Sequence, residues 1–199
     1  MRLPNKELES QILNSAIELL AEKEPVEIGM RDIAKKCNVS ATSIYNYFKD
    51  KNEVFMKISL SCISELKDLM SVSVTKIPDP VARVKKALEV YRDWCFAKPK
   101  IAILVFSKLE ENIGDEQIMN FYICNKLGEN LLAECLDSGK CKSENLKLDT
   151  GIAISGLWGC IESIITKRAD PEFWNEGKKF TDRFIEIFLD SVMKKEEEK

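Results

Sequence analysis

The segment spanning residues 30–55 constrains the fold more than any other part of this chain. Two apolar positions, Ile33 and Ala34, predict a short helix that ends near Cys37. Asn38 follows, at a point where a tight turn needs a residue that tolerates positive φ. The segment therefore begins with a short helix and a turn.

A second short helix is predicted directly after that turn. Ser40 is a suitable N-cap, and Ile44 and Phe48 lie one helical turn apart on one face. The side chains on the other faces are small, polar or hydroxyl-bearing, and no carboxylate is among them. They are Thr42, Ser43, Tyr45, Asn46 and Tyr47. A helix-turn-helix with an exposed, acid-free second helix is suited to the major groove of DNA.

This segment resembles the DNA-binding signature of the TetR family of transcriptional repressors. The matching elements are Arg31-Asp32-Ile33-Ala34, Val39-Ser40, Ile44-Tyr45-Asn46-Tyr47-Phe48, Lys49, Lys51 and Glu53-Val54-Phe55, with Ile12, Ala16, Leu19 and Leu20 upstream. Two positions depart from the family pattern, because Asn38 replaces the usual Gly and Gly29 replaces a Ser or Thr cap. Asn tolerates the left-handed conformation and Gly caps acceptably, so we expect the fold to be kept.

The resemblance implies a homodimeric, ligand-responsive repressor that binds an inverted-repeat operator in double-stranded DNA. The hydroxyls of Tyr45 and Tyr47 suit phosphate, although both tyrosines could instead be half-buried packing residues. Thr42 and Asn46 suit thymine and adenine edges respectively, with Ser43 as a further base reader. The candidate DNA-binding residues are Arg31, Ser40, Thr42, Ser43, Tyr45, Asn46, Tyr47, Lys49 and Lys51.

The distribution of charge is compatible with this function although the net charge of the chain is −3. The acids of the N-terminal part cluster before Gly29. Residues 30–51 contain five cationic and two acidic side chains. They are Arg31, Lys35, Lys36, Lys49 and Lys51 against Asp32 and Asp50. Such a local positive footprint is what phosphate contact requires.

The remainder of the chain is also predicted to be helical, which gives an all-α protein with about nine helices. Asp50, Asp79-Pro80 and Asp170-Pro171 are start signals for helices, and one long helix is predicted over residues 116–136. We expect a three-helix DNA-binding domain over residues 1–50 and a larger domain for effector binding and dimerisation over residues 51–199.

The dimer interface is predicted on the last two helices. Residues 151–161 are apolar on nearly every face, which indicates burial on both sides, and the final helix carries two apolar stripes. An ordinary monomer core is the alternative, but two recognition helices must be held one DNA turn apart to read a palindrome. The predicted interface residues are Ile154, Leu157, Ile161, Ile185, Leu189 and Val192.

The resemblance also implies a small-molecule effector in a cavity of the larger domain. Aromatic side chains at inward helix positions are candidates for its lining, although such residues more often belong to an ordinary core. They are Trp94, Phe96, Phe106, Phe121, Tyr122 and Trp158. With few polar groups among them, we expect a largely apolar effector.

Enzymatic and metal-dependent functions find no support in the sequence. The chain has no His, no phosphate-cradling Gly loop and no CxxC pair, so we expect no enzyme, no metal and no cofactor. Its seven cysteines are interpreted as small buried hydrophobes. Regulation by cysteine redox state, with Cys135 and Cys141 as the pair to test, or by a protein partner, stays as the alternative.

A cytoplasmic location is expected from the absence of targeting signals. Residues 1–10 are polar where a signal peptide would be apolar. The most apolar run, residues 151–165, is interrupted by Glu162 and is too short to span a bilayer, so no membrane association is expected.

Overall fold

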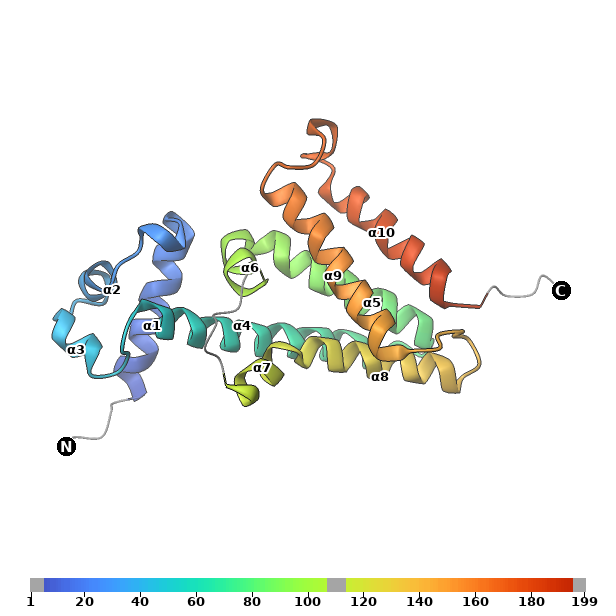
Figure 1. Ribbon diagram of the computed structural model, residues 1–199, viewed down its shortest axis with the longest axis horizontal. Coiled ribbons are helices and arrows are strands. Elements are labelled where there is room, and N and C mark those ends of the chain that lie inside the picture. Colours follow the sequence, from blue (N-terminus) through green and yellow to red (C-terminus); the bar gives the residue numbers. More distant parts are fainter. Residues whose placement is uncertain (1–5, 107–113, 195–199) are drawn as a thin grey trace. The chain divides into compact units, whose positions relative to one another are not determined.

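The computed structural model describes residues 6–106 and 114–194, and this part of the chain is almost entirely helical (Figure 1). The α-helices are α1 (Lys6–Glu22), α2 (Met30–Cys37), α3 (Ala41–Tyr45), α4 (Lys51–Val74), α5 (Pro80–Ala97), α6 (Pro99–Phe106), α7 (Asp115–Phe121), α8 (Ile123–Asp137), α9 (Leu146–Ile165) and α10 (Gly177–Val192). Two 3₁₀ turns, Pro25–Glu27 and Pro171–Phe173, complete the set, and no strand occurs within these residues. The predicted all-α class is confirmed.

The described residues form two compact units. Residues 6–62 and 100–106 make up the N-terminal unit, and residues 63–99 and 114–194 make up the C-terminal unit. Helix α4 is continuous and contributes to both. The functional boundary predicted after residue 50 stays a prediction.

The N-terminal unit has a small apolar core, built where α1 packs against α2 and α2 against α3. Ile12 and Leu20 of α1, Ile33 of α2 and Ile44 of α3 are fully buried. Phe48, just after α3, closes the core at 2% exposure. Burial of these side chains supplies the main stabilisation of a unit whose helices are too short to be stable alone.

The C-terminal unit is a bundle in which α5, α8, α9 and α10 pack on one another. Tyr91 and Cys95 of α5 and Leu157 of α9 lie at its centre. Arg92 of α5 is buried as well, and its guanidinium forms ion pairs with Asp93 and with Asp182 of α10. These ion pairs join α5 to α10 and compensate the buried charge.

Several helix boundaries differ from those predicted. The helix expected over residues 116–136 is divided into α7 and α8 at Tyr122, where the backbone leaves helical geometry (φ −97°, ψ 10°). Asp170 caps only the single turn Pro171–Phe173, and α10 begins later, at Gly177. The chain therefore has ten α-helices within the described residues rather than about nine.

Helix α9 also differs from its prediction, because only one of its faces is buried. Ala153, Leu157 and Ile161 face the core, whereas Leu148 and Ile152 are 58% and 53% exposed. Among the described helices, α9 is the one long and apolar enough to cross a bilayer by length and composition, a test that core helices of soluble proteins also pass. The sequence pattern indicated an apolar helix but not which face has a partner within the chain.

Candidate nucleic-acid interface and ligand cavity

The turn of the helix-turn-helix is set by Asn38, which adopts the left-handed conformation (φ 56°, ψ 40°). Its N–H donates to the carbonyl of Lys35 at 3.2 Å, and the N–H of Val39 donates to that of Ala34 at 3.0 Å. These bonds satisfy carbonyls at the end of α2. At the start of α2, Asp32 accepts a hydrogen bond from the N–H of Gly29 at 2.9 Å.

Helix α3 begins as predicted at Ser40, whose Oγ accepts a hydrogen bond from the N–H of Ser43 at 3.1 Å. The two serine hydroxyls also lie 2.8 Å apart. After α3, the N–H groups of Tyr47 and Phe48 donate to the carbonyl of Ile44, at 2.8 and 3.0 Å. The helical path therefore extends far enough to bury Ile44 and Phe48 on the same side.

The start of α4 fixes the residues that follow α3. Asp50 accepts a hydrogen bond from the N–H of Glu53 at 3.0 Å, and Glu53 accepts one from the N–H of Lys49 at 2.6 Å. The ammonium of Lys51 lies 3.4 Å from the carbonyl of Pro25 and 3.5 Å from that of Val26. Lys51 thus has a structural role in joining α4 to the first 3₁₀ turn.

The predicted DNA-binding residues lie at the start of α2, in α3 and in the segments that flank α3. Arg31, Ser40, Thr42, Tyr45, Asn46 and Lys49 are exposed, whereas Ser43, Tyr47 and Lys51 are half-buried. Lys36 is directed elsewhere, since its ammonium pairs with Glu18 at 3.2 Å and Glu22 at 3.4 Å, and these carboxylates raise its pKa. Arg31, Lys35 and Lys49 make no ion pair with any described residue and so supply the positive charge of this region.

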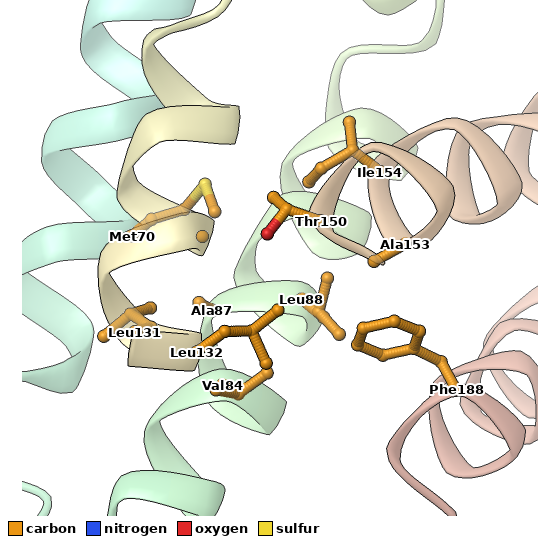
Figure 2. A pocket seen from close by; sticks show the side chains of 11 residues that line it. Met70, Val84, Ala87, Leu88, Leu131, Leu132, Thr150, Ala153, Ile154 and Phe188 are labelled. Carbon is orange, nitrogen blue, oxygen red and sulfur yellow. The ribbon is translucent and has the colours of Figure 1, made fainter. Parts of the chain in front are cut away.

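The C-terminal unit contains a small cavity of about 20 Å³ between five helices (Figure 2). Its lining is aliphatic except for one aromatic ring and one hydroxyl. The lining residues are Met70, Val84, Ala87, Leu88, Gly128, Leu131, Leu132, Thr150, Ala153, Ile154 and Phe188. None of the described residues that line the cavity is charged.

The N-terminal unit decides the family. Residues 12–58 match the domain described as "Bacterial regulatory proteins, tetR family". This unit therefore carries a TetR-family DNA-binding domain. Two relatives extend the similarity over most of the chain, each at 24% identity. The probable acrEF/envCD operon repressor of Escherichia coli (strain K12) aligns with 90% of this chain and 86% of its own length. The fatty acid metabolism regulator protein of Bacillus subtilis (strain 168) aligns with 78% and 80%.

Solved structures of similar fold include FadR from Bacillus subtilis in complex with stearoyl-CoA, with a TM-score of 0.66 at 18% identity. The alignment covers 91% of this chain and 95% of FadR. Members of the family regulate transcription, so the expected class of DNA-binding regulator rather than enzyme is supported.

The aromatic residues predicted for an effector pocket do not gather around the cavity. Trp94 is buried and Phe96 half-buried on α5, Phe121 and Tyr122 lie where α7 meets α8, and Trp158 is half-buried on α9. Phe106 ends α6, in the N-terminal unit. The residues that do line the cavity are mostly small aliphatics, which in a sequence are indistinguishable from ordinary core.

Most of the residues predicted for the dimer interface are buried inside the subunit. Leu157, Ile161, Ile185 and Val192 are buried within the subunit, at 5% exposure or less. Their stripes on α9 and α10 hold these two helices of one subunit together, so they cannot form the contact surface of a partner. Ile154 lines the cavity and Leu189 is half-buried.

All seven cysteines are free thiols, and five of them are buried. Burial raises the pKa of Cys124 to about 12 and that of Cys135 to about 11. Cys141, the other member of the pair predicted for a redox test, is 1% exposed. The raised pKa values of Cys124 and Cys135 suppress the thiolate that reacts with oxidants.

Proposed function

We propose that this protein is a dimeric transcriptional repressor that binds an inverted-repeat operator and is released by a small, largely apolar effector. The observation that carries the proposal is the exposed helix α3, which has no carboxylate and is placed by the Asn38 turn and the Ser40 cap. The family and the E. coli operon repressor among its relatives support repression. Such a regulator acts on the chromosome, hence in the cytoplasm.

On this proposal, residues 1–50 read DNA, and the contacts divide by chemistry. Arg31, Tyr45, Tyr47, Lys49 and Lys51 contact phosphates, whereas Thr42, Ser43 and Asn46 read base edges. Ser40 contributes by capping α3. Because α3 is short and the chain is acidic overall, one copy gives little affinity, and two copies are needed to read both halves of a palindrome.

The surface proposed for dimerisation is the exposed face of α9. Gly151, Ser155 and Gly159 follow one another at four-residue spacing, and a Cβ added at either glycine would meet no atom within 4 Å. Leu148 and Ile152, both more than half exposed, flank these positions. A stripe of small residues lets a second α9 approach closely, and the flanking apolar side chains then leave water in both copies. This face replaces the interface residues predicted from the sequence.

The proposed effector site is the cavity of the C-terminal unit. FadR, which binds stearoyl-CoA, shares this fold, and the cavity is lined by aliphatic side chains that suit a hydrocarbon chain. Met70 of the lining belongs to α4, the helix that begins at Lys51 just after the recognition segment. A ligand that favours a displaced α4 would therefore shift the population away from the DNA-binding arrangement.

The experiment that tests the proposal is selection of bound DNA from a random pool by the purified protein. We expect an inverted repeat with half-sites about one helical turn apart, roughly 10 base pairs between centres. The control is the same selection with protein refolded after denaturation, which removes any copurified effector. Recovery of a single half-site, or of no specific sequence from the refolded protein, would contradict the proposal.

A further inference from the structure

The hydroxyl of Thr150 in α9 differs from those of Thr181 in α10 and of Thr75 just after α4. Thr181 donates to the carbonyl of Gly177 at 2.8 Å, and Thr75 donates to that of Val72 at 2.8 Å. A threonine in a helix normally bonds to the preceding turn in this way. Thr150 is only 2% exposed, yet its Oγ1 has no hydrogen-bond partner among the residues that the structure describes.

The side chain of Thr150 packs against the helix opposite. A Cβ added to Gly128 of α8 would lie 2.7 Å from Cγ2 and 3.8 Å from Oγ1 of Thr150, so the missing side chain of Gly128 makes room for the threonine. The hydroxyl lies in the cavity, among Met70, Leu88 and Leu132, as Figure 2 shows. A single polar atom is therefore presented to an otherwise apolar space.

The cavity is a poor site for water. Its volume of about 20 Å³ is enough for about one molecule, but a buried water usually makes about three hydrogen bonds and would find one polar side chain here. A ligand that places one polar atom against Oγ1 and hydrocarbon against the remaining lining matches this distribution better.

We propose that Thr150 is the specificity-determining anchor of the effector, which is a neutral aliphatic molecule with one oxygen that hydrogen-bonds to Oγ1. A free carboxylate does not fit, because no cationic side chain is among the described residues that line the cavity and could compensate its charge. An alcohol, ester, thioester or ketone oxygen does fit. This inference rests on the proposed effector site. Because the cavity is small, binding must move its lining helices apart, which couples occupancy to conformation.

The test uses 1-octanol and octanoate as probes, with binding measured by isothermal titration calorimetry at neutral pH. The decisive variants are Thr150→Val, which keeps the shape but lacks the hydroxyl, and Thr150→Ser, which keeps the hydroxyl. Gly128→Ala fills the space beside Thr150, and Thr75→Val is the matched control at an exposed hydroxyl outside the cavity. Thermal unfolding and operator binding are recorded for every variant.

We expect octanol to bind more tightly than octanoate and Thr150→Val to weaken octanol binding about 3- to 10-fold, the range for one hydrogen bond. Thr150→Ser and Thr75→Val should stay close to the natural protein, and Gly128→Ala should weaken octanol binding. Equal octanol affinity in the natural protein and Thr150→Val, tighter binding of octanoate, or no binding of octanol would each overturn the inference. If operator binding persists in those cases, the repressor function stands and only the anchor fails.

Discussion

At the scale of single residues, Asn38 is the position where the backbone itself limits substitution. Its φ of 56° lies in the left-handed region. This conformation costs most residues roughly 1 kcal/mol or more of free energy, because their Cβ approaches the backbone, whereas Asn and Asp tolerate it and Gly has no Cβ. We therefore predict that Asn38→Ala lowers the free energy of unfolding by about 1 kcal/mol, whereas Asn38→Gly changes it by less than about 0.5 kcal/mol. Urea unfolding monitored by circular dichroism measures both. An alanine variant as stable as the natural protein would disprove a strained turn.

The division between phosphate contacts and base contacts is also a prediction about single residues. Lys49→Gln should weaken binding to all operator variants alike and reduce the slope of log affinity against log salt by about one. Asn46→Ala should weaken the preferred operator by about 1–3 kcal/mol and relax the preference at one base pair. Fluorescence anisotropy over a salt series measures these effects, with Lys178→Gln on the exposed start of α10 as the control. Identical behaviour of the two variants on every operator would refute the division.

Features fixed by neighbours in sequence could be predicted, and features fixed across helices could not. Asn38, Ser40 and Asp79 each bond to a residue three or four positions away, so their roles follow from local rules. Thr150 is different, because the space for its side chain depends on Gly128 of another helix. Nothing in the local sequence of either residue indicates that they meet, and a threonine in an apolar helix gives no signal that its hydroxyl lacks a partner.

At the scale of elements, α9 shows how one helix serves two surfaces. Gly156 faces inward, where a Cβ would lie 2.5 Å from Cζ of Phe184 in α10, whereas Gly159 faces outward into open space. The apolar composition of α9 predicted burial but could not separate these two faces, since both are rich in small and aliphatic residues. Only the packing of α10 shows that the inner face is already occupied.

This difference gives a matched pair of substitutions in α9. Gly156→Leu should destabilise the chain by about 1–3 kcal/mol or more, because Phe184 must move. Gly159→Leu should leave the subunit as stable as before, since leucine favours helix, but should block the close approach of a second α9. Thermal unfolding and sedimentation equilibrium distinguish the two effects. A Gly159→Leu protein that remains a dimer of unchanged affinity would show that the partner binds elsewhere.

At the scale of the whole molecule, the distribution of thiols separates a ligand-controlled regulator from a redox-controlled one. The seven cysteines are spread over both units, and those that a redox switch would need are enclosed. A pKa of about 11 for Cys135 leaves on the order of one thiolate in ten thousand at pH 7. Cys37, half-buried at the end of α2, and Cys160, half-buried in α9, are the accessible exceptions.

We therefore predict that millimolar hydrogen peroxide or diamide leaves operator binding unchanged in the natural protein over minutes at pH 7, while an effector releases the DNA. Thiol labelling followed by mass spectrometry should modify Cys37 and Cys160 first and reach Cys124 and Cys135 only after unfolding. Cys37→Ser is the control, because modification beside the recognition segment could disturb DNA contact without any switch. Release of DNA by oxidant from the Cys37→Ser protein, with reversal by dithiothreitol, would instead establish redox control through the remaining thiols. A buried thiol of the C-terminal unit can react only if that unit opens. Entry of an effector into the small cavity of the same unit requires the same motion, so the rate of thiol labelling also reports on access to the cavity.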